Sequence, residues 1–175
     1  MRTDSGRPIP ESYWVLPDQF LAGESPGQFD EAQTDQRLDA LLKAGFDTFI
    51  DLKHPDERAS YVGLLKTRAH ADGRKISYHN FPILDGGLPD RTEMLRTLDA
   101  IDSALSNGNK VYLHCWAGVG RTGTVVGCYL VRHGRTGLEA LEQIARWWQD
   151  VPKRRYFPRS PETAEQVKFI LAWRE

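Results

Sequence analysis

Two kinds of hydrophobic pattern alternate along the chain. Short apolar runs bounded by Gly, Pro, Asn or Asp predict strands, whereas apolar residues that recur every three or four positions predict helices. The predicted strands cover 13–16, 19–23, 46–52, 76–83 and 110–114. Helices are predicted to begin near Phe29, Pro55, Asp90, Thr124, Thr136 and Ser160. This alternation predicts a single α/β domain with a mainly parallel central sheet and helices on both faces.

Local signals mark several of these helix starts. Pro55 is predicted to open one helix, with the acidic Glu57 in the first turn, where the helix dipole favours a negative charge. Asp90 and Glu93 have the spacing of a capping box at the next helix. Ser160, followed directly by a proline, predicts the start of the last helix.

The size of the chain agrees with one domain. A chain of 175 residues with 40% hydrophobic content can bury one sizeable core. We expect residues 1–12 to form a polar tail and residues 13–175 to form the domain. The first residues lack the apolar segment of a secretory signal, and no apolar run reaches the length of a membrane span. We therefore expect no membrane partner. We also expect the protein to be a monomer.

Charge and cysteine content narrow the classes of function. The formal net charge of −1 argues against a general binder of nucleic acid or of membrane surfaces. The two cysteines do not make a disulfide framework, and a reactive thiol is best preserved in a reducing compartment. These features predict a cytoplasmic protein that has no nucleic acid partner.

The most informative chemistry follows the predicted strand 110–114. That strand leads into Cys115, a glycine-rich turn, Arg121 and a helical segment. If the turn directs its amide groups inward, these groups and the positive end of the helix form a site for a dianion such as phosphate. Cys115 would lie at the floor of the site, where the same positive field favours a thiolate. Arg121 has paired donors that suit two phosphate oxygens.

The order His-Cys, five residues, Arg-Thr resembles the signature of the cysteine-dependent protein tyrosine and dual-specificity phosphatases. The alternative is a purely structural role, in which Cys115 is a buried cysteine at the end of a core strand and the glycines only form a turn. The resemblance implies the small single-domain type of this superfamily, similar to kinase-associated phosphatase and with a dual-specificity phosphatase-like fold. It also implies that the substrate phosphate is bound by Trp116, Ala117, Gly118, Val119, Gly120 and Arg121.

The resemblance further implies a catalytic aspartate on a mobile loop upstream of the cysteine. Asp85 is the candidate, because two glycines follow it and give the loop conformational freedom. The segment 81–87 resembles the acid loop of the kinase-associated phosphatase group more than the Trp-Pro-Asp loop of tyrosine phosphatases. Asp90 is the rival acid, but its predicted capping box gives it a structural role.

Three further side chains are assigned roles by the resemblance. Thr122 is implied to bond the cysteine sulfur and help it leave as a thiolate, and His114 is implied to order the loop. Gln166 lies in a Ser-Pro-Glu-Thr segment that resembles the helix start of small dual-specificity phosphatases, where it would position the hydrolytic water. Its alternative is a polar residue on the helix surface. Cys128 lies in an apolar helix and is predicted to be part of the core.

The implied activity is that of a phosphatase that needs no metal or cofactor and forms a phosphocysteine intermediate. Its partner would be a phosphorylated protein or peptide, with phosphotyrosine first and phosphoserine or phosphothreonine as further substrates. A phosphoinositide, inositol phosphate or RNA 5′-phosphate is the alternative substrate. Lipid and inositol phosphatases of the superfamily that the chain resembles often carry Lys within the signature loop. The loop residues Trp116, Ala117 and Val119 are uncharged here, so the resemblance favours a protein over a lipid substrate. A phosphoresidue-binding module without catalysis is the alternative from another class.

Overall fold

Five strands form one sheet in the computed structural model, which describes residues 6–57 and 59–175. The sheet order is β1-β2-β5-β3-β4. β1 pairs with β2 in antiparallel orientation, and the other neighbours are parallel, so the predicted mainly parallel sheet is confirmed. The strands are β1 (Ser12–Leu16), β2 (Phe20–Gly23), β3 (Thr48–Asp51), β4 (Ser77–Asn80) and β5 (Val111–His114).

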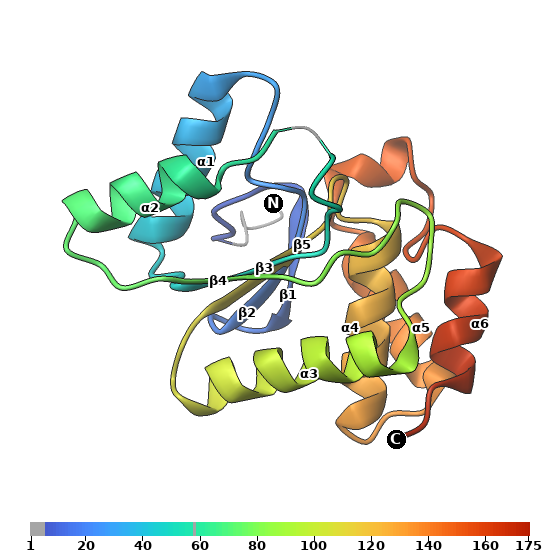
Figure 1. The fold of residues 1–175 in the computed structure, drawn as a ribbon. Helices are drawn as coiled ribbons and strands as arrows, with labels where there is room; N and C mark the ends of the chain where they lie inside the picture. Colours follow the sequence, from blue (N-terminus) through green and yellow to red (C-terminus); the bar gives the residue numbers. More distant parts are fainter. Residues whose placement is uncertain (1–5, 58) are drawn as a thin grey trace.

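Helices cover both faces of this sheet (Figure 1). One face carries α1 (Glu31–Lys43) and α2 (Val62–Ala71). The opposite face carries a larger group, in which α4 is the central helix and contacts α3, α5 and α6 as well as β2 and β5. The members of this group are α3 (Arg91–Ser106), α4 (Gly120–Arg132), α5 (Gly137–Trp148) and α6 (Ala164–Ala172), with the 3-10 helix η1 (Pro152–Arg155) between the last two.

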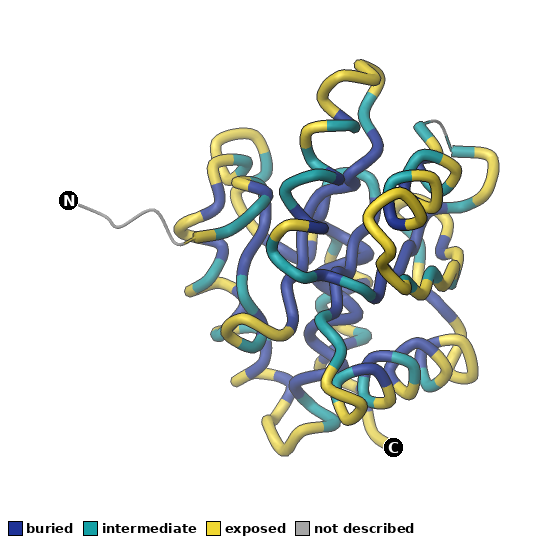
Figure 2. The backbone as a smooth tube through the Cα atoms, turned by 90° about the vertical axis from the view of Figure 1, so that its left-hand side faces the viewer, coloured by how far each residue is buried: buried dark blue, intermediate teal, exposed yellow. Residues whose placement is uncertain are grey.

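The central strand β5 is buried from both sides. Tyr112 contributes to the apolar cluster under α1 and α2, whereas Val111 and Leu113 contribute to the larger cluster under α3 to α6. Successive side chains of a strand point to opposite faces, so these neighbouring residues reach separate halves of the core. Figure 2 shows the buried backbone running through the middle of the molecule. The strand that leads to Cys115 is therefore firmly held on both faces.

Two of the helices begin later in the chain than predicted. The stretch at Pro55 is a turn and α2 begins only at Val62, because the carboxylate of Glu57 accepts a hydrogen bond from the amide of His54, 2.8 Å away, and pairs with a distant arginine. The last helix begins after Thr163, whose side chain forms a capping box, and not at Ser160. The predicted capping box at α3 is confirmed.

Part of the stretch predicted as a polar tail packs against the domain. Ile9 is fully buried in the cluster under α1 and α2, and β1 already begins at Ser12. The carboxylate of Glu11 accepts a hydrogen bond from the amide of Lys153, 2.8 Å away. Residues 1–5 lie outside the described residues.

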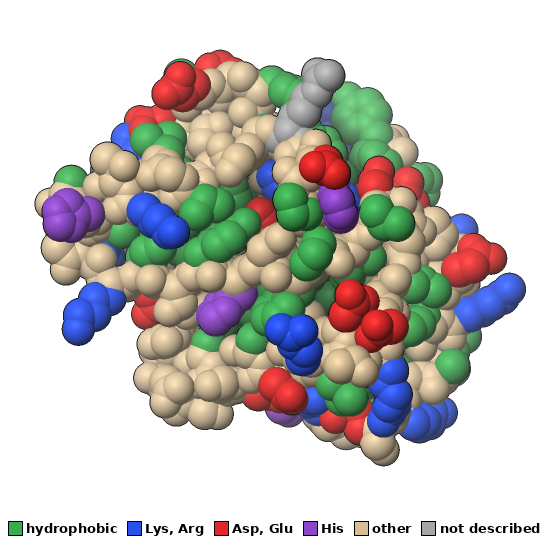
Figure 3. Space-filling view, viewed as in Figure 1, with side chains coloured by type: hydrophobic (Ala, Val, Ile, Leu, Met, Phe, Trp, Pro, Cys, Tyr) green, Lys and Arg blue, Asp and Glu red, His purple; other side chains and the backbone are tan. Residues whose placement is uncertain are grey.

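Charges of both signs are scattered over the face of the molecule shown in Figure 3. Within the described part of the chain, no helix combines the length and the apolar character needed to cross a bilayer. Open α/β sheets bind their ligands at the carboxyl ends of their parallel strands, and Cys115 directly follows the carboxyl end of β5.

Candidate active site

The loop between β5 and α4 begins at Cys115 and is held against the segment that follows β2. The amide of Ser25 donates to the carbonyl oxygen of Trp116 over 3.0 Å. Gly118 has a φ of +76°, and a Cβ atom at this position would lie 2.4 Å from the backbone carbon of Gly23. Only glycine fits both the backbone conformation and this close approach. The glycine of the turn therefore lets the loop curl tightly against its neighbour.

Cys115 lies at the floor of this loop and is 3% exposed. The hydroxyl of Thr122 donates to its sulfur over 3.1 Å. The helix α4 starts at Gly120, earlier than the predicted start at Thr124, so the positive end of its dipole lies close to the loop. The structure thus brings together the predicted nucleophile, the predicted hydroxyl donor and a helix terminus that favours an anion.

His114 is fully buried and uses both ring nitrogens. Nε2 lies 2.6 Å from the hydroxyl of Tyr61, and Nδ1 lies 3.0 Å from the carbonyl oxygen of Cys115. Burial lowers the pKa of His114 and raises that of Tyr61, so both are neutral at pH 7. We assign the hydroxyl as the donor to Nε2 and Nδ1–H as the donor to the carbonyl. This arrangement ties the side chain of His114 to the backbone at Cys115, and its role in ordering the loop stays a prediction.

The guanidinium of Arg121 is 2% exposed and is surrounded by acceptors. Glu57 holds it with both carboxylate oxygens, at 2.5 Å from Nη1 and 3.0 Å from Nη2. The carbonyl oxygen of Ile83 accepts from Nη1 over 3.0 Å, and Asp85 lies 3.1 Å from Nη2. The predicted phosphate-binding arginine and the predicted acid are therefore neighbours.

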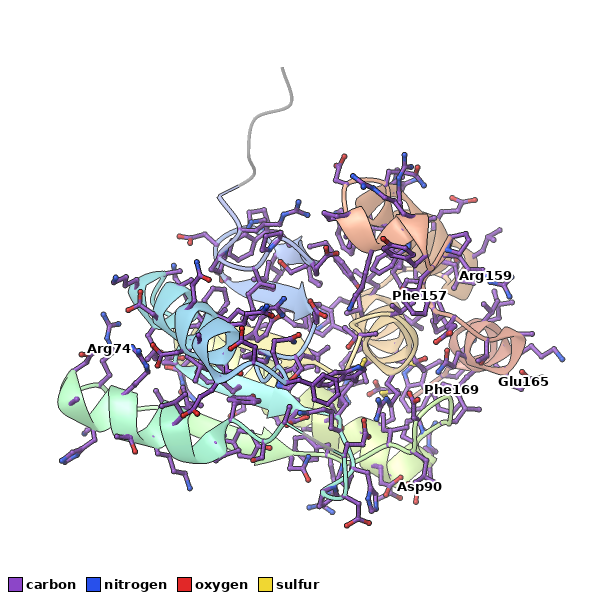
Figure 4. All side chains as sticks on the ribbon, turned by 90° about the horizontal axis from the view of Figure 1, so that it is seen from above. Arg74, Asp90, Phe157, Arg159, Glu165 and Phe169 are labelled. Carbon is purple, nitrogen blue, oxygen red and sulfur yellow. The ribbon has the colours of Figure 1, made fainter. Side chains whose placement is uncertain are left out.

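Asp85 and its rival Asp90 occupy different surroundings. Asp85 has a side chain that is 85% exposed, and it lies in a turn where Gly86 has a φ of +71°. The side chain of Asp90 caps α3 by accepting from the amide of Glu93 over 2.8 Å, and Figure 4 shows it at the outer end of that helix. Asp85 alone of these two pairs with Arg121 among the described contacts.

Gln166 is buried, so the alternative of a surface residue is wrong. Its Oε1 accepts from the amides of Glu162 and Thr163, each over 3.1 Å, and its Nε2 donates to the carbonyl oxygen of Gly87 over 3.3 Å. The side chain therefore joins the start of α6 to the loop that carries Asp85. Its contribution to positioning water stays a prediction.

Two charged residues of the site were not predicted from the sequence. Glu57 holds the guanidinium, and Lys53 is a buried ammonium whose Nζ lies 5.7 Å from the ring centroid of Trp116. Burial lowers the pKa of Lys53, while the nearby Asp51 and Glu57 oppose the shift. Both residues follow β3, which lies beside β5 in the sheet. Adjacent parallel strands end at one edge, and this was the signal that could have identified them.

Cys128 is fully buried in α4, which confirms its predicted place in the core. Burial raises the pKa of its thiol, so it stays protonated at neutral pH. Within residues 6–57 and 59–175, no group of three or more His, Cys, Asp or Glu side chains is arranged to hold a metal ion.

Replacing Glu57 with glutamine is expected to destabilise the protein by about 2 kcal/mol at pH 7, since it weakens charge-assisted hydrogen bonds to a buried guanidinium. Burial acts to raise the pKa of Glu57, but hydrogen bonds from Arg121 and the amide of His54 outweigh it and lower the pKa. A depressed folded-state pKa stabilises the protein above the unfolded-state pKa, and this stabilisation is lost as the pH falls through the folded-state value. Thermal unfolding of the parent and of Glu57→Gln, measured from neutral to acidic pH, tests this expectation.

The Tm of the Glu57→Gln variant and the Tm of the parent protein should accordingly converge at acidic pH. The matched control is Asp56→Asn, because the side chain of Asp56 is 91% exposed and pairs only with His54 among the described contacts. This control should shift Tm by less than about 1 °C, in keeping with a weak surface ion pair. A constant difference between Glu57→Gln and the parent at all pH values would contradict the assigned role of the carboxylate.

The sequence of this chain is similar to those of known phosphatases. Residues 24–135 match the family model described as "Polymorphic toxin system, DSP-PTPase phosphatase". The chain is 32% identical over 127 residues to protein tyrosine phosphatase domain-containing protein 1 of Mus musculus, covering 69% of this chain and 17% of that protein. It is 33% identical over 98 residues to phosphatidylinositol 3,4,5-trisphosphate 3-phosphatase and protein-tyrosine-phosphatase PTEN1 of Arabidopsis thaliana, covering 55% of this chain and 24% of the relative.

A solved structure of kinase-associated phosphatase shares the fold, with a TM-score of 0.65 at 17% identity and coverage of 94% of this chain and 96% of the other. In that structure the catalytic site cysteine is substituted by serine. The chain spans about a quarter or less of the length of the two curated relatives named above. The predicted dual-specificity phosphatase-like fold is confirmed by this likeness.

Proposed function

Because the chain belongs to the DSP-PTPase phosphatase family, as its signature predicted, we propose that it hydrolyses phosphotyrosine in proteins through a phosphocysteine formed at Cys115. Phosphoserine and phosphothreonine are the further candidate substrates. The observation that carries the proposal is the pair of contacts around the loop. The hydroxyl of Thr122 donates to the sulfur of Cys115, and Arg121 lies beside Asp85.

In the first step, the thiolate of Cys115 attacks phosphorus in line with the tyrosyl oxygen. The S–P bond forms as the P–O bond to the leaving group breaks. Amides of residues 116–120 and the guanidinium of Arg121 bind the equatorial oxygens, where charge accumulates in the transition state. Asp85 gives its proton to the departing oxygen, so tyrosine leaves as a neutral phenol.

A bound phosphate would change the contacts of Arg121 without releasing it. Glu57 holds both terminal nitrogens from one side, whereas the exposed Asp85 contacts only Nη2. A phosphate oxygen that takes the Nη2 donor leaves the carboxyl of Asp85 free to turn to the leaving oxygen. The partly buried carboxylate of Glu57 therefore orients the guanidinium, and the exposed carboxylate of Asp85 does the chemistry.

In the second step, the carboxylate of Asp85 takes a proton from water, and the water oxygen attacks phosphorus. The S–P bond breaks and inorganic phosphate is released. The hydroxyl of Thr122, 3.1 Å from the sulfur, stabilises the thiolate as it leaves. Gln166 is joined to the loop of Asp85 through Gly87, which supports a role in placing the water.

A kinetic panel tests the proposed substrate. Peptides of one sequence that carry phosphotyrosine or phosphothreonine are compared with a soluble phosphatidylinositol 3,4,5-trisphosphate, since the relative from Arabidopsis is named for that lipid. We expect kcat/KM to be at least about tenfold higher for phosphotyrosine than for either competitor. The rates should be unchanged by a metal chelator. A higher kcat/KM for the phosphoinositide would replace the proposed substrate with a lipid.

A further inference from the structure

An aromatic side chain stands exposed beside the cysteine loop. Phe29, in the segment between β2 and α1, is 75% exposed. Its ring centroid lies 5.1 Å from that of Trp116, with an interplanar angle of 58°. Trp116 directly follows Cys115 in the chain and is only partly exposed. The pair thus connects the floor of the candidate active site to the molecular surface.

The backbone around Phe29 is fixed relative to the loop. The amide of Ser25 donates to the carbonyl oxygen of Trp116 over 3.0 Å, and the amide of Gln28 donates to the hydroxyl of Thr34 on α1 over 2.8 Å. The hydroxyl of Tyr112 in β5 donates to the carbonyl oxygen of Glu24. Contacts on both sides of the segment therefore hold Phe29 at one place on the rim.

The ring of Trp116 has contacts of its own. The ammonium of Lys53 lies 5.7 Å from its centroid, within the range of a cation–π interaction. The ammonium also donates to the carbonyl oxygen of Ala59 over 3.2 Å, so its position is set by the backbone. An aromatic platform held by Phe29 and by a buried cation is already ordered before a substrate arrives, which lowers the entropy lost on binding.

We propose that Phe29 and Trp116 form a shelf that contacts the phenyl ring of a phosphotyrosyl substrate, which makes Phe29 a specificity-determining residue. This inference rests on the proposed function. A phosphotyrosine places its phosphate at the far end of a rigid ring, so the ring must bridge the phosphate site and the rim. Phosphoserine and phosphothreonine have no ring to contact the shelf. Offset or edge-to-face aromatic pairs are more favourable than area burial alone.

The test compares Phe29→Ala with Leu138→Ala, a matched removal of an exposed hydrophobic side chain. Leu138 is 60% exposed on α5 and has no part in the site. Steady-state kinetics use phosphotyrosine and phosphothreonine peptides of one sequence. We expect Phe29→Ala to lower kcat/KM for phosphotyrosine about three- to tenfold, chiefly through KM, and to change the phosphothreonine value less than about twofold. Leu138→Ala should change kcat/KM for neither peptide. Phe29→Tyr keeps the aromatic ring and should therefore retain the parent values.

Equal losses on both peptides, or no loss on either, would overturn the shelf. Thermal unfolding separates these outcomes from misfolding, since both exposed side chains can be removed with little change in Tm. The parent protein distinguishes the two proposals. A parent that prefers phosphotyrosine while Phe29→Ala retains that preference refutes the shelf alone. A parent without phosphatase activity refutes the proposed function and the shelf together.

Discussion

Replacing Cys115 with serine is expected to reduce turnover of an aryl phosphate by at least about 10⁴-fold. A serine hydroxyl is a far weaker nucleophile than a thiolate, and among the described residues the loop offers no histidine placed to remove its proton. Both ring nitrogens of His114 are already engaged, by Tyr61 and by the carbonyl oxygen of Cys115. The fold should remain, because serine is smaller and still accepts the hydrogen bond from Thr122.

The measurement combines steady-state rates with trapping of the intermediate. Acid quenching with a labelled substrate should leave phosphate on the parent protein and none on Cys115→Ser. Cys128→Ser is the control, since this second thiol is buried in α4 away from the loop. Normal turnover by Cys115→Ser would remove the phosphocysteine from the mechanism.

Replacing Asp85 with asparagine is expected to lower kcat for a phosphotyrosine peptide by about 10²- to 10⁴-fold, the usual contribution of a general acid. The amide has nearly the same shape and can still accept from Arg121, so binding of the phosphate should change little. The loss should be smaller for an aryl phosphate whose leaving group needs no proton.

The rival acid provides the matched control. Asp90→Asn makes the same change of charge at the cap of α3, where asparagine is also a good cap. Its kcat should stay within about twofold of the parent, with a change in stability of less than about 1 kcal/mol. If Asp90→Asn instead shows the large loss of activity, the choice of Asp85 as the acid is wrong.

The part of the site that lies within one strand, loop and helix could be predicted from the sequence. Cys115, Thr122 and Arg121 are close in the chain, so their spacing and the strand before them already define the loop. Glu57 could not be placed in this way, because it enters the site only through the pairing of β3 with β5. Its local context, an acid two residues after Pro55, matches a helix start equally well. Local signals describe neighbours in the chain and carry no information on a partner such as Arg121.

The start of the last helix shows the same limit. Both Ser160 and Thr163 are suitable N-caps, and their side chains have different tasks in the fold. The hydroxyl of Ser160 donates to the carbonyl oxygen of Val119 in the cysteine loop over 2.7 Å. The cap is therefore provided by Thr163, with Gln166 completing the capping box. The choice depends on a loop that is distant in the sequence, so the helix pattern alone left it undetermined.

The supports of the cysteine loop reach beyond the stretch that matches the family model, which ends at residue 135. Lys153 donates to the carbonyl oxygen of Ala117 over 3.2 Å. Near the start of α6, Ser160 donates to the cysteine loop and Gln166 donates to the loop that carries Asp85. A chimera that transplants only residues 24–135 would carry Cys115, Arg121 and Asp85, but it would lack β1, β2 and these C-terminal contacts, and it would leave the outer side of α4 uncovered. A graft of this chemistry onto another scaffold must therefore include the two N-terminal strands and the C-terminal helices.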